Sequence, residues 1–290
     1  MLERSISATN LMTAMRWFVA NLADPRSTPY FISIDHSPSE QINGSEWHHS
    51  ALILCSNVEH QMLADTLGQT LNPEKKILRQ WKNTDLRYRQ KFHHEFFHAL
   101  KNHPILVIGV SAKESVILSN EQGLAHELGI TGHYRRIEQD GKVKVEFGPY
   151  ICSEEDEPEA LLVPASQAPM AIFNASYLLR IHSALTIAVR EHLGETSGIP
   201  LWIQVMSDKP PNDFGGLYAK LMWLLLGGPP TQGKFTWGGF TGNEDQPIDL
   251  LADNLAGLFN EITLHPENYQ YKGPELQPPV TGVFYWERLE

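Results

Sequence analysis

The chain has 290 residues, of which 42% are hydrophobic and 20% charged, a composition that excludes a fibrous repeat or a largely disordered chain. Two cysteines supply no disulfide framework, and charged residues interrupt the apolar N-terminus, so we expect a cytoplasmic protein without a secretory signal. No apolar run approaches the roughly 20 residues that a membrane span needs, so we expect no membrane partner.

The first half of the chain predicts a helix followed by strands. Apolar residues at helical spacing predict a packing helix over residues 6–22. Residues 30–35 predict a buried strand that ends on Asp35. A second strand is predicted over residues 50–55, after a polar turn with Asn43 and Gly44. A helix over 73–102 and a strand over 105–110 follow.

Residues 112–165 differ in texture from the rest of the chain. Residues 134–138 and 143–147, joined through Asp140 and Gly141, predict a β-hairpin. An acidic loop follows it. We interpret the segment as an insertion in the main domain and not as a domain of its own.

The second half alternates again between helix and strand. Helices are expected over residues 176–193, 214–226 and 249–262. Strands are expected over residues 199–206, reaching Asp208, and over 234–240. Such alternation, with some strands solidly apolar, indicates an α/β fold with a sheet covered by helices on both faces.

The domain organisation follows from these elements. Residues 1–27 are expected to form an N-terminal helix that packs on the main domain. The main domain covers residues 28–265, with the insertion at about 112–165. Residues 266–290 are expected to be a C-terminal tail or strand.

Three acids stand where burial makes a carboxylate costly. Asp35 ends the first apolar strand, Asp208 follows the strand at 199–206, and Asp253 lies in the late apolar helix. Carboxylates at strand ends and on an abutting helix can converge on one edge of a sheet. There they would bind Mg²⁺ or Mn²⁺, which prefer oxygen ligands. Asp249 and Glu74 are further candidates for a fourth acid.

These acids and the order of elements around them resemble a bacterial family, the domain-of-unknown-function 3800 family, over about residues 28–262. That family opens with Asp-Glu-Ser-Gly after its first strand. It closes with a helix reading roughly Leu-Gln-Leu-Ala-Asp-Leu-Leu-Ala-Gly. The corresponding runs here are Asp35-His36-Ser37-Pro38 and Ala252-Asp253-Asn254-Leu255-Ala256-Gly257.

The resemblance implies an RNase H-like fold and a metal-dependent nuclease that cuts DNA or RNA through two divalent ions. It also implies an association with phage defence or mobile elements. The first motif here lacks the glutamate and the glycine of the family. A family Glu-x-Lys motif has its nearest match at Glu74-Lys75-Lys76. These departures keep an alternative open, namely a lapsed RNase H-like module that serves as a binding or scaffold subunit of a defence complex.

A different class of function is suggested by His94-Glu95-Phe96-Phe97-His98, a literal His-Glu-x-x-His motif. On a helix, His94 and His98 would share one face and bind Zn²⁺, with Glu95 as the base of a zinc metallopeptidase. Nothing in the sequence marks a third ligand. Basic residues near the motif are also unlike the apolar residues that usually precede the first histidine of such a helix.

The net charge of −11 disfavours nucleic-acid binding by the chain as a whole, but basic residues concentrate between Lys75 and Lys101. Screening confines an electrostatic field to roughly 10 Å, so a local basic stripe can bind phosphates on an acidic protein. An ordinary solvated helix face is the alternative. The nucleic-acid-binding candidates are Arg79, Lys82, Arg87, Lys91 and Lys101.

Overall fold

A computed structural model provides the structure of the protein. The residues it describes are 8–42, 45–60, 104–128, 134–150, 159–164, 168–196, 200–208, 225–226, 233–241, 247–264 and 283–289.

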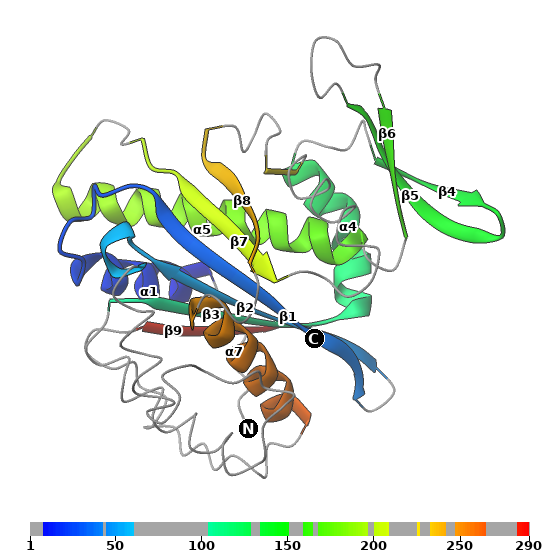
Figure 1. The fold of residues 1–290 in the computed structure, drawn as a ribbon, viewed down its shortest axis with the longest axis horizontal. Coiled ribbons are helices and arrows are strands. Elements are labelled where there is room, and N and C mark those ends of the chain that lie inside the picture. The colour runs from blue at the N-terminus through cyan, green and yellow to red at the C-terminus, as the bar shows by residue number, and fades with distance from the viewer. Residues whose placement is uncertain are drawn as a thin grey trace.

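A six-stranded mixed sheet forms the centre of the molecule (Figure 1). Its strand order is β8-β7-β1-β2-β3-β9. β1, β2 and β3 pair in antiparallel fashion, whereas β7 lies parallel to β1, β8 parallel to β7 and β9 parallel to β3. The strands are β1 Tyr30–Ile42, β2 Ser45–Cys55, β3 Leu106–Lys113, β7 Ile203–Asp208, β8 Phe235–Thr241 and β9 Val283–Leu289.

The prediction that the first strand ends at Asp35 was wrong, because β1 continues to Ile42. The reason is that β2 also extends beyond the apolar run, back to Ser45, and gives the polar second half of β1 a partner. The register shifts between Ser37 and Glu40. Pro38 lies at this irregularity, as expected because proline has no backbone N–H to donate to a neighbouring strand.

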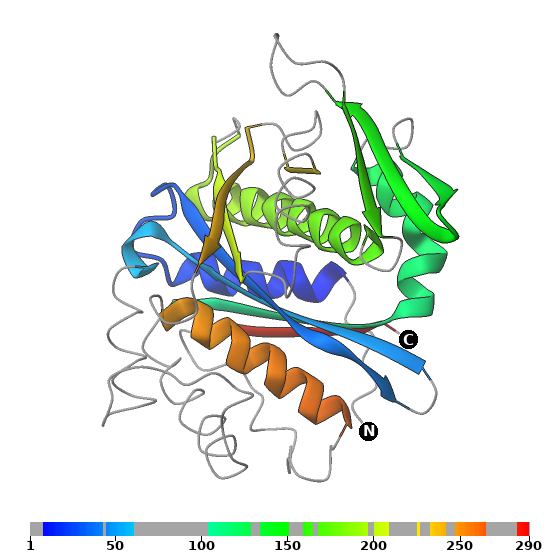
Figure 2. The ribbon, with the colours of Figure 1, turned by 45° about the vertical axis from the view of Figure 1, so that its right-hand side comes forward.

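Helices cover both faces of the sheet (Figure 2). α1 Ala8–Ala20, α4 Glu114–Glu127 and α5 Ala168–Leu193 lie on one face, and α7 Pro247–Leu264 lies on the other. α7 begins at Pro247, where the fixed φ of proline suits the first helical turn and its missing N–H leaves no bond unmade. The fold is therefore mixed α/β, with helices on both faces of a mixed sheet.

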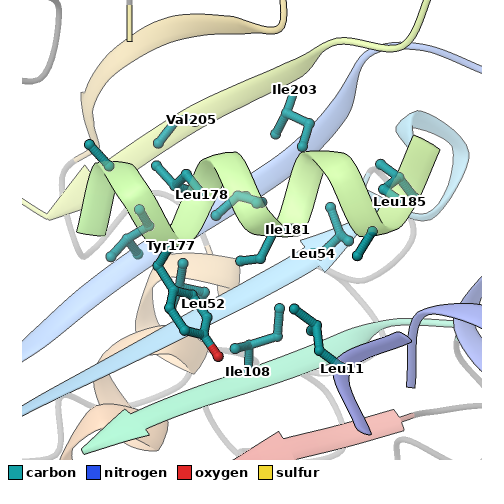
Figure 3. Packing of buried hydrophobic residues seen from close by; sticks show 14 of the residues in the cluster. Leu11, Leu52, Leu54, Ile108, Tyr177, Leu178, Ile181, Leu185, Ile203 and Val205 are labelled. Atoms are coloured by element: carbon teal, nitrogen blue, oxygen red, sulfur yellow. The ribbon is translucent and has the colours of Figure 1, made fainter. Parts of the chain in front are cut away.

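The main hydrophobic core lies between the sheet and α5. Figure 3 shows Leu178, Ile181 and Leu185 of α5 packed toward the strands. Leu52 of β2 and Val205 of β7 belong to the same cluster, and both are fully buried. The segment Ala171–Leu193 is long and apolar enough to cross a membrane, but 72% of its most apolar stretch is buried inside the protein, as a core helix would be.

Ion pairs tie the helices of this layer to one another. Arg16 of α1 contacts Glu191 of α5 with a 2.7 Å separation between Nε and Oε2. Glu127 at the end of α4 accepts hydrogen bonds from Ser176 and Arg180 of α5, the latter at 3.1 Å. These hydrogen bonds hold the pKa of Glu127 below its usual value, although burial acts to raise it.

The predicted hairpin is confirmed and belongs to a second, three-stranded sheet that projects from the main body (Figure 1). β4 Tyr134–Gln139, β5 Lys142–Tyr150 and β6 Glu159–Pro164 are antiparallel. Asp140 and Gly141 both have positive φ, 54° and 67°, as a two-residue type I′ turn requires. β6 and α4 were not predicted from the sequence.

The remaining predicted elements compare as follows. The helix at 6–22, the strands at 105–110 and 234–240 and the helices at 176–193 and 249–262 correspond to α1, β3, β8, α5 and α7 with shifted ends. The strand at 199–206 begins later, at Ile203, and reaches Asp208 as β7. The turn at Asn43 and Gly44, the helix at 73–102 and most of the helix at 214–226 lie outside the described residues.

Candidate functional site

Positions 35 and 208 are brought side by side by the pairing of β1 with β7. The parallel register runs from Tyr30 opposite Ile203 to Ile34 opposite Ser207. Continued by one residue, it places position 35 level with position 208. Adjacent strands lie about 4.8 Å apart, so these two backbone positions are close neighbours. Asp35 is thus the residue at which β1 loses β7 as a partner and continues with β2 alone.

Both positions belong to the face of the sheet that α7 covers. Ile32, Ile34 and Val205 point into the core on the α5 side. Because side chains alternate along a strand, Asp35 points to the opposite side, and position 208 falls on that side as well. Asp35 is buried, with 7% of its surface exposed. A carboxylate buried to this degree needs polar partners or a cation, because taking the charge out of water is costly.

The third predicted acid lies on α7. Leu251, Leu255 and Leu258 of this helix are buried at helical spacing, and they anchor it over β1, β2 and β3. Asp253 is half-buried on the same helix. Asp249 lies one turn earlier, so positions 249 and 253 share one flank of α7.

Small residues accompany Asp35 across the sheet. On β2 its partner is Ala51, and the partner of Ala51 on β3 is Gly109. The level of Asp35 therefore carries no bulky side chain on the next two strands. α7 presents Ala252 and Ala256, both buried, in the same layer. Small residues on both sides allow the helix to lie close to the sheet, which brings its acids toward the level of Asp35.

Two buried polar residues on this face were missed by the sequence analysis. His49 of β2 is 1% exposed, and Ser111 of β3 is fully buried. A 2.8 Å hydrogen bond joins Nδ1 of His49 to Oγ of Ser111. Each interrupts a strand at a position where alternation predicts an inward-facing side chain. That polar residue at an inward position was the available signal.

Asn254 of α7 was quoted in the closing motif but not singled out. It is fully buried, and it falls on the stripe of α7 that Leu251, Leu255 and Leu258 define. Ser33, two residues before Asp35 on β1, is buried on the same face of the sheet. The layer between α7 and the sheet thus combines apolar anchors with a group of buried polar side chains.

The other predicted site residues lie outside the described residues. Glu74 is among them, as are His94, Glu95 and His98 of the zinc motif. The same holds for the basic residues Arg79, Lys82, Arg87, Lys91 and Lys101.

The residues present fit a hard divalent cation by their chemistry. Asp35 and Asp253 supply carboxylate oxygens, the ligands that Mg²⁺ and Mn²⁺ prefer. Within the part of the chain that the structure describes, no group of three or more His, Cys, Asp or Glu side chains is gathered closely enough to hold a metal ion. The side chains of Asp208 and Asp249 are outside that part.

Comparison of the chain with protein-family models, with curated proteins and with solved structures finds no match.

Proposed function

We propose that the protein is an RNase H-like nuclease that cuts phosphodiester bonds of DNA or RNA with Mg²⁺ or Mn²⁺. The observation that carries the proposal is the register that sets positions 35 and 208 on neighbouring strands, on the face that α7 covers with Asp253. Asp35, Asp208 and Asp253 would hold the metal, with Asp249 or Glu74 as a fourth acid.

The strand arrangement supports the fold part of the proposal. Three antiparallel strands, β3-β2-β1, continue into two parallel strands, β7 and β8, and a helix carrying an acid follows β8 in the chain. This is the order in which an RNase H-like domain places its strands and its acids. The resemblance to the domain-of-unknown-function 3800 family points the same way, and with it comes the proposed association with phage defence or mobile elements.

The bound metal ions would activate a water molecule and stabilise the leaving oxygen of the phosphodiester. What the chain itself supplies is the placement of the carboxylates. Asp35 is fixed by a strand that pairs on one side with β7 and on the other with β2. Asp253 is fixed by the leucines that anchor α7. Carboxylates on such rigid elements need little rearrangement to bind a cation.

The test is a nuclease assay with Mg²⁺ and Mn²⁺ on single- and double-stranded DNA and RNA. Holding the metal is worth several kcal/mol, and each 1.36 kcal/mol corresponds to tenfold in rate, so Asp35→Asn should slow cleavage about 100-fold or more. Asp24→Asn is the matched control, because Asp24 is exposed in the turn before β1 and its Oδ1, which accepts from the Arg26 N–H, is retained. Cleavage that survives Asp35→Asn would sink the proposal.

Two other outcomes would point to the alternatives. Wild-type protein that binds Mn²⁺ or nucleic acid without cutting would favour the lapsed binding module, which the divergent run Asp35-His36-Ser37-Pro38 suggests. Stoichiometric zinc in the purified protein, lost on His98→Ala, would favour the metallopeptidase.

The basic residues between positions 79 and 101 are proposed to bind the phosphates of the substrate. Each lost phosphate contact should flatten the slope of log affinity against log salt by roughly 0.7–0.9, equally for all sequences. A salt titration of wild type against Arg87→Ala/Lys91→Ala measures this slope. Equal slopes would show that these residues form ordinary solvated surface.

A further inference from the structure

His49 and Ser111 form a buried polar pair that the three acids do not account for. Both lie on the α7 face of the sheet, the face of Asp35. Burying an imidazole and a hydroxyl costs free energy unless both find partners, and their mutual hydrogen bond offsets only part of that cost. Two apolar side chains would stabilise this layer better, so the pair calls for a functional explanation.

The ring of His49 is held in place from two sides. Ser111 engages Nδ1 from β3 at 2.8 Å. The indole of Trp47, two residues earlier on β2, lies nearly parallel to the imidazole, with an interplanar angle of 7° and 6.4 Å between ring centroids. Lys113 Nζ lies 5.4 Å from the centroid of the Trp47 ring. The imidazole therefore has a defined orientation, with Nε2 directed away from β3.

His49 is the diagonal neighbour of Asp35. Asp35 pairs with Ala51, and His49 is the next residue of β2 on the same face. Diagonal neighbours in an antiparallel pair are about 7–8 Å apart, which is within reach of long and aromatic side chains. Ala51 between them is too small to separate the two groups. Away from β3 is also the direction of β1, so Nε2 lies on the Asp35 side of the ring.

We infer that His49, oriented by Ser111, is a positioning residue of the acid site whose Nε2 reaches the hydration shell of the divalent cation held by Asp35. The inference rests on the proposed function. Mg²⁺ gives up its waters reluctantly and keeps several of them in protein sites. Those waters need oriented polar partners, and loss of such a partner typically lowers metal affinity 10–100-fold. A buried, fixed imidazole one step from the acid meets this need.

The experiment measures Mn²⁺ binding to the full chain by isothermal titration calorimetry, without substrate. His49→Asn keeps a polar group near the Nδ1 position but loses the reach of Nε2, so we expect it to weaken binding about 10–100-fold. His49→Gln places an amide nitrogen near the Nε2 position and should recover much of that affinity. Ser111→Ala should show an intermediate loss, because the ring keeps Trp47 but loses the partner of Nδ1.

His182→Asn is the matched control. His182 is a histidine of α5, 7% exposed, whose Nε2 donates to the carbonyl oxygen of Leu201 on the other side of the sheet. It should lose stability but keep Mn²⁺ affinity. Thermal unfolding of each variant confirms that binding is compared between folded proteins, and Ser111→Ala remains as the milder variant if His49→Asn does not fold.

The outcomes separate the inference from the proposal beneath it. Wild-type protein that binds no Mn²⁺ overturns both. Wild-type affinity that persists in His49→Asn and Ser111→Ala overturns the role of His49 and leaves the metal site standing. A loss in His49→Asn that His49→Gln does not restore, or that His182→Asn reproduces, shows a packing effect and also overturns it.

Discussion

The two faces of the central sheet are built differently. Toward α5, residues such as Ile34, Leu52 and Ile108 form one continuous apolar cluster. Toward α7, the same strands present Asp35 and His49 among their buried residues. Neighbouring residues of one strand thus serve different ends: the α5 face stabilises the fold, and the α7 face carries polar groups at a cost in stability.

The physical basis of this contrast is the period of two along a strand. Alternation lets one strand contribute to two layers without compromise in either, because each side chain meets only its own layer. A buried polar group interrupts the apolar cluster only on its own face. The α5 face can therefore supply enough apolar burial to support a costly α7 face, and substitutions on the two faces should have separable effects.

The largest expected effect compares Leu52→Ala with Ile53→Ala. These residues are consecutive on β2, 1% and 0% exposed, and face α5 and α7 respectively. Each substitution should cost about 2–5 kcal/mol in the free energy of unfolding, since each leaves a cavity. Only Ile53→Ala should also weaken Mn²⁺ binding, because Ile53 belongs to the layer on which α7 rests. Denaturant unfolding and calorimetry measure the two quantities, and equal Mn²⁺ affinity in both variants would break the comparison.

A smaller effect is expected for Asn254→Ala. Asn254 is fully buried in the α7 layer and interacts with its surroundings. Removing its amide should cost about 1–3 kcal/mol, because the groups it contacts lose a polar partner inside the protein. Chemical denaturation checks this value. A variant more stable than wild type would show that the polar character of this layer is not organised around Asn254.

The pH dependence of stability sharpens the view of the α5 face. Burial lowers the pKa of His182 below its ordinary value of 6.5. The folded state therefore disfavours the charged imidazole, and the unfolded chain takes up the proton first as pH falls. The stability that neutral His182 contributes is complete above about pH 6.5 and is lost as pH falls through the folded pKa.

Thermal unfolding at about pH 7.5 and 5.5 measures this loss. Wild type should lose more of its Tm than His182→Gln, which does not titrate in this range. Burial also lowers the pKa of His60, so the variant should keep part of the pH dependence. Identical Tm changes in the two proteins would contradict the assignment to His182.

The smallest effect is expected at the surface of the α5 layer. Arg16 and Glu191 are about half exposed. Their ion pair should contribute only about 0–1 kcal/mol, because solvent and salt screen it. Arg16→Ala should thus change the free energy of unfolding by less than the other substitutions, and the difference should vanish in about 1 M salt. A loss comparable with that of Leu52→Ala would mean that Arg16 matters through packing.

Some features of the protein followed from local patterns in the chain. Apolar spacing predicted α1, α5 and α7, because helix periodicity is a property of the sequence itself. Asp140 and Gly141 predicted the hairpin, because few residue pairs tolerate positive φ twice in succession. Asp35 and Asp253 stood out as single acids in apolar segments. α4 did not, since its sequence alternates too weakly between polar and apolar residues.

Other features depended on contacts between distant segments. The end of β1 could not be predicted, because its polar second half is a strand only through its pairing with β2. The grouping of positions 35 and 208 depends on the β1–β7 register, which joins segments more than 170 residues apart in the printed chain. His49 looked like one polar residue among several, until its hydrogen bond to Ser111 and its face of the sheet were known.

What the sequence by itself determined is the set of secondary-structure elements with local periodicity, and the acids within them. Periodicity acts over a few residues, so it can be read without knowing what packs against what. The tertiary structure decided which face each polar residue occupies and which acids share a level of the sheet. Those properties arise from strand pairing and register, and a shift of one residue in either would have turned Asp35 away from α7 and into the apolar core.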